Sequence, residues 1–260
     1  MFCHLKELYE HRELILSLGL RELKARYKQT VFGISWALVQ PLSMMLILTL
    51  VFSRIAKLPS DGIPYPIFVY STLVFWQFFT LTFSQGTTSL VGNASLVRKV
   101  YFPREICFLA IFFSAAADLA ISFALLLVLR AYYALPLTWN LLWIAPILAV
   151  QVLFTLGLVS LTSSLHVRFR DIGHALPLVN QIWMFASPVA YSLSAVPASL
   201  LPFYLLNPMA AIMDSYRRVI VLNTGPNLEY LAASLLTAAV LFGIFYPLFK
   251  RSELHFADVI

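Results

Sequence analysis

The sequence predicts an all-α polytopic membrane protein with six transmembrane helices. Of the 260 residues, 60% are hydrophobic and only 12% are charged, which leaves too little polar surface to cover a water-soluble globule. The apolar residues are grouped into six charge-poor stretches, each about as long as the roughly 20 helical residues that cross a bilayer. Because these stretches lack the alternating pattern of a membrane barrel, we expect helices, whose backbone groups are hydrogen-bonded internally.

The expected spans are distributed along the whole chain and form a single domain. They cover residues 34–53, 67–88, 106–129, 141–165, 176–193 and 230–249. With the N-terminus in the cytoplasm, 13 of the 18 basic residues fall on the inner side, as the positive-inside rule requires. We therefore expect both termini, including the tail 250–260, to be cytoplasmic. The net charge of +6 reflects this topology and gives no reason to expect nucleic acid as a partner.

The segment between the fifth and sixth spans is longer than one crossing requires. Residues 172–213 contain no Asp, Glu, Lys or Arg. We expect an external re-entrant or interfacial hairpin that ends in a short amphipathic helix. In this prediction Asn207 caps the helix, Pro208 is its first residue, and Arg217 and Arg218 lie on its wet side.

The N-terminal segment predicts an amphipathic helix lying along the inner membrane surface, ahead of the first span. It covers residues 5–32 within the cytoplasmic segment 1–33, and its apolar stripe is formed by Leu16, Leu20, Leu23 and Tyr27. Charged residues occupy much of the remaining surface. Two interpretations remain open at this level: an anchor on lipid headgroups, and a docking face for a partner protein.

The groups that a membrane enzyme would need are not clustered in the sequence. There is no carboxylate pair, the five histidines have no metal-ligand spacing, and no phosphate-binding loop is present. Asp118 is the one Asp, Glu, Lys or Arg inside an expected span, where burying a charge costs about 3 kcal/mol or more. It lies on a stripe of small and polar residues formed by Ala110, Ser114, Asp118 and Ser122. An interhelical hydrogen bond, with Asp118 charged or protonated, and a role in a transport pathway both remain open.

Seven short motifs, taken together and in order, resemble one family. They are RYKQTVFG (26–33), WALVQPL (36–42), SLVRKVYFPREI (95–106), VRFRDI (167–172), SPVAY (187–191), LNPM (206–209) and FADVI (256–260). The chain is similar to the membrane subunit of polysaccharide-exporting ABC transporters, the ABC-2 type permeases that export O-antigen, capsule or teichoic-acid chains. The C-terminal motif favours an O-antigen-like system.

This resemblance implies a homodimer in the bacterial inner membrane, surrounded by membrane lipids. Each copy would bind a separate ATP-binding cassette subunit that holds ATP and magnesium, so the chain itself would need no cofactor or metal and would have no catalytic residues. The cargo would be a lipid-linked polysaccharide. The resemblance places the ATPase contact at Arg98, Lys99, Tyr101, Phe102, Arg104, Glu105, Arg21, Lys24 and Arg26.

The resemblance also places an exit region at Ser187, Pro188, Tyr191, Asn207 and Pro208. Aromatic residues make up 15% of the chain, more than interfacial belts need, and aromatic faces could stack on sugar rings in a passage. As channel residues we select Trp36, Trp76, Trp183 and Tyr191.

Three other functions remain as alternatives. The first is a drug or small-lipid exporter of the same superfamily, which differs in its cargo. The second is a membrane-embedded enzyme acting on a lipid carrier, which would need the missing carboxylate pair or metal. The third is an ion-coupled carrier, whose transport would depend on Asp118.

Overall fold

The computed structural model describes residues 7, 9–57, 60 and 62–259, and this part of the chain is helical without strands. Positions 5, 6 and 8 of the expected N-terminal helix and the last residue of the FADVI motif lie outside it. Within these described residues, five helical segments are long and apolar enough to cross a membrane. They are Gly33–Ile55 (η1 Gly33–Ser35, α3 Trp36–Leu48 and η2 Thr49–Ile55), α4 Tyr65–Gly92, α6 Glu105–Tyr132, Trp139–Arg168 (η3 Trp139–Trp143 and α7 Ile144–Arg168) and α11 Leu228–Val259.

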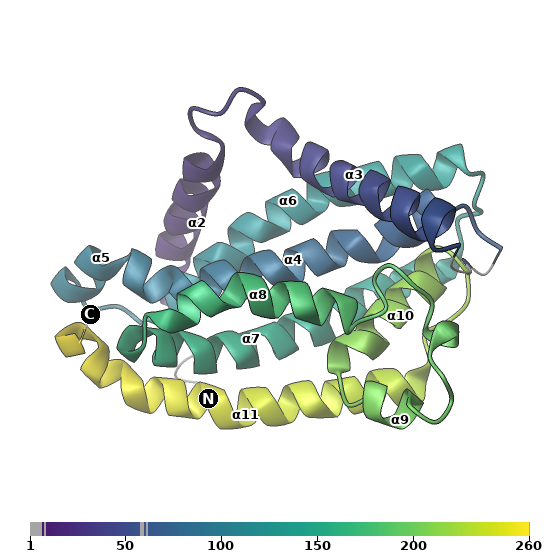
Figure 1. Cartoon of the computed structure of the whole chain (residues 1–260). Helices are drawn as coiled ribbons and strands as arrows, with labels where there is room; N and C mark the ends of the chain where they lie inside the picture. Colours follow the sequence, from purple (N-terminus) through teal and green to yellow (C-terminus); the bar gives the residue numbers. More distant parts are fainter. Residues whose placement is uncertain (1–6, 8, 58–59, 61, 260) are drawn as a thin grey trace.

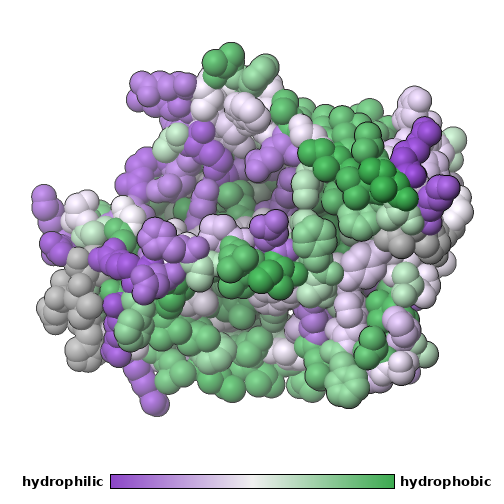
Figure 2. Space-filling view, viewed as in Figure 1, coloured by the Kyte–Doolittle hydropathy of each residue, from purple (hydrophilic) through white to green (hydrophobic). Residues whose placement is uncertain are grey.

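The long helices run side by side, the short helix α8 Asp171–Phe185 runs along them beside α4 and α7, and the other shorter elements lie across this bundle or toward its ends (Figure 1). The shorter elements are α2 Arg12–Tyr27, α5 Ala94–Lys99, α8 Asp171–Phe185, η4 Leu193–Ala195, α9 Leu201–Tyr204 and α10 Pro208–Ile220. In Figure 1, α5 and the C-terminal end of α11 lie at one end of the bundle and α9 lies at the other. Figure 2 shows hydrophobic surface over α11 and α3, and hydrophilic surface gathered around α2 and α5.

Five of the six expected spans coincide with these long helices, and the remaining one, the fifth (176–193), is only partly helical. α8 has 15 residues, a length of about 22 Å, which is shorter than a hydrocarbon core of roughly 30 Å. The helix ends at Phe185, just before the SPVAY motif. The physical reason is Pro188, because a proline disfavours helical backbone at the residue before it.

α4 lies at the centre of the fold and is buried over most of its surface. Its aromatic side chains pack on three other helices. The ring of Phe75 stacks on Tyr216 of α10 at 3.7 Å between centroids, and Phe79 contacts Phe154 of α7 and Trp183 of α8. Such pairs add to the free energy gained from burying apolar area, so α4 holds α7, α8 and α10 against the core.

The N-terminal helix α2 packs on α6 with a face that differs from the expected apolar stripe. Leu18 and Gly19 are buried against α6, where a Cβ on Gly19 would meet the ring of Phe113. Leu16 and Leu20 of the expected stripe are 43% and 45% exposed. The helix therefore has a protein-facing side in addition to its exposed apolar and charged residues.

Helix α10 begins as the sequence predicts but is not a wet amphipathic helix. The side chain of Asn207 accepts a hydrogen bond from the backbone N–H of Met209 at 3.1 Å, and Pro208 is the first helical residue. The prediction that Arg217 lies on a wet side is wrong, because Arg217 is 1% exposed. Only Arg218 is partly exposed, and it pairs with Asp214.

Arg217 is buried because it satisfies the backbone of the irregular segment after α8. Its guanidinium donates to the carbonyl oxygens of Pro188, Val189 and Tyr191 at 2.8–2.9 Å and lies 4.0 Å from the centroid of the Phe68 ring. Carbonyl groups outside a helix need other donors when they are buried. A guanidinium supplies several donors in one plane, so Arg217 fastens this segment to α4 and α10.

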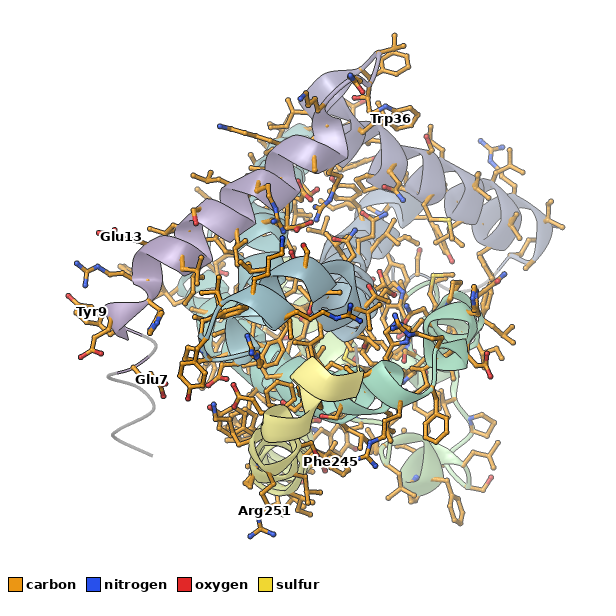
Figure 3. All side chains as sticks on the ribbon, turned by 90° about the vertical axis from the view of Figure 1, so that its left-hand side faces the viewer. Glu7, Tyr9, Glu13, Trp36, Phe245 and Arg251 are labelled. Carbon is orange, nitrogen blue, oxygen red and sulfur yellow. The ribbon has the colours of Figure 1, made fainter. Side chains whose placement is uncertain are left out.

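We expect Arg217→Ala to lower the unfolding free energy by about 2–3 kcal/mol, the contribution of hydrogen bonds to a charged group. Arg251→Ala is the matched control, because Arg251 is exposed and points away from the molecule (Figure 3). Thermal unfolding of the purified chain in detergent measures both variants. Equal melting temperatures for the two variants would show that Arg217 does not brace this segment.

We expect Gly157→Ala to loosen the contact between α7 and α11. A Cβ at residue 157 would lie 2.9 Å from the backbone nitrogen of Phe242, and overpacking of this kind costs about 1–3 kcal/mol. Gly243→Ala is the control, since nothing lies within 4 Å of a Cβ there and alanine favours a helix over glycine. The same thermal assay should show a lower melting temperature only for Gly157→Ala; a rise in both variants would contradict the close packing.

Candidate functional site

One face of α4 remains open, and this face is polar. Gln77, Thr80, Ser84, Gln85 and Thr88 are only partly buried, whereas most of the other residues of the helix are fully buried. Their spacing of three and four residues places them on one side of the helix. A polar stripe along an otherwise buried, bilayer-length helix is costly unless it contacts protein, water or a polar ligand.

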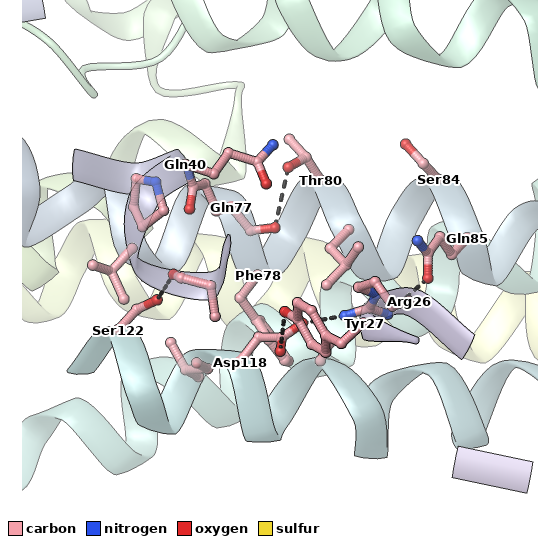
Figure 4. Close-up of a pocket in the computed structure, with 16 residues that line it drawn as sticks. Arg26, Tyr27, Gln40, Gln77, Phe78, Thr80, Ser84, Gln85, Asp118 and Ser122 are labelled. Atoms are coloured by element: carbon pink, nitrogen blue, oxygen red, sulfur yellow. Dashed lines mark hydrogen bonds and ion pairs between the residues drawn. The ribbon is translucent and has the colours of Figure 1, made fainter. Parts of the chain in front are cut away.

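The polar stripe forms the floor of a cavity of about 300 Å³ between α2, α3, α4 and α6. Figure 4 shows Gln40, Gln77, Thr80 and Ser84 around this space, with Asp118 and Ser122 on α6. Apolar side chains complete the lining, among them Pro41, Val74, Leu81 and Leu119. The cavity therefore offers hydrogen-bonding groups beside apolar walls.

A second cavity, of about 330 Å³, lies along the same face of α4 toward α5. Its lining includes Glu22 of α2 and, from the C-terminal part of α4 onward, Thr88, Gly92 and Asn93. Arg26 and Gln85 line both cavities. The two side chains thus separate two spaces that follow a single polar face.

Arg26 and Tyr27 tie α2 to Asp118 in the middle of α6. The Arg26 guanidinium forms an ion pair with Asp118 and also donates to Gln85 Oε1 at 2.9 Å and Ser114 Oγ at 3.2 Å. The Tyr27 hydroxyl donates to Asp118 Oδ1 at 2.7 Å. Burial and the neighbouring Asp118 carboxylate raise the pKa of Tyr27 to about 12, so the phenol remains a hydrogen-bond donor at neutral pH. Asp118 is therefore in contact with a second element, as the interhelical interpretation requires.

The residues selected for the ATPase contact separate into exposed and buried groups. Arg98, Lys99 and Tyr101 are exposed at the end of α5, and the Tyr101 side chain is 85% exposed. On α2, Arg21 and Lys24 are also exposed, although Arg21 contacts Glu22 and Asn93. Arg26 points inward to Asp118, so it is not on the face that a docking subunit would touch.

Phe102, Arg104 and Glu105 are buried and connect the start of α6 to α11. The Arg104 backbone N–H donates to Glu253 Oε1 at 2.7 Å, and its guanidinium lies 4.8 Å from the centroid of the Phe102 ring. Lys250 Nζ contacts both carboxylate oxygens of Glu105 at 3.0 and 3.1 Å. These three residues form an internal brace behind the exposed end of α5.

The four aromatic residues selected for a channel are not gathered around one space. Trp36 is 41% exposed at the start of α3, whereas Trp76 is 3% exposed and packs on Phe79 in the core. The placement of Trp76 argues against a channel role, because its side chain does not reach either cavity. Tyr191 bonds to the Tyr204 hydroxyl at 2.8 Å and to the Phe185 carbonyl.

The residues selected for the exit region do lie together. Trp183 Nε1 donates to Asn207 Oδ1 at 2.9 Å, and Asn207 Nδ2 donates to Ser187 Oγ at 2.9 Å. Pro188 follows Ser187 and binds Arg217 through its carbonyl, and Pro208 opens α10. This cluster closes the end of α8 against the start of α10.

The polar stripe of α4 was missed in the sequence, although a signal for it is present. Gln77, Thr80, Ser84, Gln85 and Thr88 recur at helical spacing within a span that contains no charge. Aromatic residues are more numerous in the same span, and the channel residues were selected from the aromatic residues alone. A search for polar residues of one helical face, rather than for one residue class, would have found the stripe.

Comparison with known proteins extends along almost the entire chain. The family model described as "ABC-2 type transporter" matches residues 13–221. The O-antigen export system permease protein RfbA of Myxococcus xanthus is 30% identical over 258 residues, which cover 98% of both chains. A protein of the same name from Klebsiella pneumoniae is 26% identical over 95% of both chains. The polysialic acid transport protein KpsM of Escherichia coli is 21% identical over 83% of this chain and 85% of its own length.

The family match covers α2 to α10, and therefore both cavities and the buried Arg217 brace. The helical fold with bilayer-length segments agrees with it. The chain belongs to the ABC-2 type transporter family.

Proposed function

We propose that this chain is the membrane-spanning permease of an ABC exporter that moves a lipid-linked polysaccharide, of O-antigen or capsule type, across the bacterial inner membrane. The observation that carries the proposal is the similarity to O-antigen export permeases over nearly the full length of both proteins. A drug or small-lipid exporter of the same family would share the fold and differ in cargo. In this proposal ATP and magnesium are bound by a separate cassette subunit, and the chain itself supplies the passage.

The polar face of α4 supports a passage for a sugar chain. Amide and hydroxyl side chains such as Gln77, Thr80 and Ser84 can exchange hydrogen bonds with sugar hydroxyl groups, and each such bond is weak enough for a chain to slide. Exposed apolar residues of α3, η2 and α8 flank this face, among them Ile47, Leu50, Leu178 and Ile182. A second copy placed over these residues would enclose the passage between two subunits, as in a twofold homodimer.

The proposed topology has six crossings and both termini in the cytoplasm. α8 and the irregular segment after it would form the fifth crossing, and α9 and α10 an external hairpin. The basic residues Arg98, Lys99, Lys250 and Arg251 belong to the bundle end that carries α5 and the end of α11 (Figure 1), as expected for a cytoplasmic side. In α2, the exposed Leu16 and Leu20 would contact lipid and the basic residues would contact headgroups.

The proposed coupling surface is the exposed end of α5. Closure of the cassette subunits would push on Arg98, Lys99 and Tyr101, which are exposed. The buried Phe102, Arg104 and Glu105 would carry this displacement to α11, because they hold α6 and α11 together. Rigid elements of this kind are the physical means by which one site can bias another.

The proposed function is tested by reconstitution into vesicles with its cassette subunit. We expect transfer of the lipid-linked polysaccharide only when ATP is hydrolysed. Transfer at full rate by the purified chain alone, without nucleotide, would refute the proposal. Transfer of small drugs or free lipids in place of the glycan would favour the other exporter class.

We expect Thr80→Trp to block export, because an indole would fill part of a cavity of about 300 Å³. Thr80→Val is the control, since it keeps the volume and removes a hydroxyl that bonds only to the carbonyl of Gln77 within its own helix. Polysaccharide at the cell surface and permease in the membrane fraction are measured together. Normal export by the tryptophan variant would mean that the cargo passes elsewhere.

We expect the double change Arg98→Glu and Lys99→Glu to lower export at least about tenfold, because like charges would replace a complementary contact. Arg54→Glu is the control, as Arg54 is exposed in η2, far along the chain from α5. Export and nucleotide hydrolysis are measured for the complex with each variant. Thermal unfolding checks that the variants have equal melting temperatures, so that a loss of stability does not explain a loss of export. If Arg54→Glu has the larger effect, the coupling surface is misassigned.

A further inference from the structure

Arg26 lies at the junction of the two cavities beside α4. It lines both of them together with Gln85, and the two side chains are hydrogen-bonded at 2.9 Å. One cavity reaches toward α5 at Gly92 and Asn93, and the other follows the polar stripe to Gln77. A ligand that moved along α4 from one cavity to the other would therefore have to pass the guanidinium of Arg26.

The guanidinium is accessible and has donors to offer. The Arg26 and Asp118 side chains are 19% and 15% exposed, so the pair borders the cavity and is not sealed in the core. A guanidinium has five N–H donors, and the bonds to Asp118, Gln85 and Ser114 account for three of them. Such a group binds phosphoryl oxygens through two parallel hydrogen bonds, a geometry that an ammonium group lacks.

The surroundings fit a phosphoryl group attached to both a lipid and a sugar. Apolar side chains such as Pro41, Val74 and Leu119 line the same cavity as Thr80, Ser84 and Gln85. The phosphoryl group of a lipid-linked glycan is the junction between an apolar chain and a polar one. A charge at this depth is costly without a counter-ion, so an anionic ligand would gain from a positioned arginine.

We propose that Arg26 binds the diphosphate of a prenyl-type lipid carrier, and that this anion replaces Asp118 on the guanidinium. The inference rests on the proposed function and assigns a ligand to this position of the cavity. Asp118 acts as the resident counter-ion that the cargo displaces. When the exchange occurs, Asp118 keeps the hydrogen bond from the Tyr27 hydroxyl, and the Arg26 side chain is drawn away from Gln85.

The proposal is tested by ligand binding to the purified full chain in phosphatidylcholine nanodiscs. The probes are geranylgeranyl diphosphate, inorganic diphosphate and the uncharged geranylgeraniol. We expect Arg26→Gln to weaken binding of geranylgeranyl diphosphate at least about tenfold, the effect of losing a hydrogen bond to a charged group. We expect Asp118→Asn to tighten it several-fold, because the competing carboxylate charge is removed. Arg12→Gln is the control, since Arg12 is exposed on the same helix and contacts Tyr9.

Tightening by Asp118→Asn separates ligand competition from a merely structural role, because loss of a structural ion pair would weaken binding. Unchanged or weaker binding in Asp118→Asn overturns the proposal, as does equal binding of geranylgeraniol. If phosphatidylglycerol fully displaces geranylgeranyl diphosphate, the site binds bulk anionic lipid. If N-acetylneuraminic acid fully displaces it, the site binds sugar carboxylates. Either result overturns the proposal.

Two further results keep the test independent of variant folding and of the proposed function. In the unmodified chain, a photoreactive prenyl diphosphate should label α3, α4 or α6, and labelling confined to other helices overturns the inference. If Arg26→Gln binds the diphosphate as the unmodified chain does while polysaccharide export is intact, the inference fails and the proposed function stands. If the diphosphate binds through Arg26 but no polysaccharide is exported, the proposed function fails instead.

Discussion

The ion pair between Arg26 and Asp118 fastens α2, which lies across the bundle, to the helices that run along it. Near the middle of a bilayer-length helix, either charge alone would cost several kcal/mol, so the two groups constrain each other's position. Because Gln85 and Ser114 complete the same cluster, the pair also sets the distance between α2, α4 and α6. Arg26 lines both cavities, and Asp118 lines the one between α3, α4 and α6.

The same physical rule operates at the two ends of the bundle. At the α5 end, the Glu105 carboxylate holds Lys250 of α11, and Glu253 accepts from the backbone of Arg104. At the opposite end, Arg217 supplies donors to carbonyl groups that have left the helix. Charged side chains thus brace the points where the chain departs from regular helices, and the end of α5 beside one of these braces remains exposed.

The residues that could be predicted from the sequence are those whose role depends on near neighbours in the chain. Five spans and the cap formed by Asn207 and Pro208 were predicted correctly, because apolar length and helix capping are local properties. The interruption of the fifth expected span after Phe185, the burial of Arg217 and the inward position of Arg26 were not. In the site, the exposure of Arg98 and Lys99 and the clustering of Ser187 with Asn207 agree with expectation, whereas Trp76 belongs to the core.

The sequence alone determined that this is a membrane protein, that its backbone is helical, and where most of its bilayer-length helices begin and end. Hydrophobic length is read from consecutive residues, and without the alternating pattern of a closed barrel the helix is the backbone arrangement that lipid tolerates. Only the tertiary structure decided where the long charged side chains point. Arg26 meets Asp118 across 92 positions of the chain, and the direction of a flexible side chain depends on the partner that folding brings within its reach.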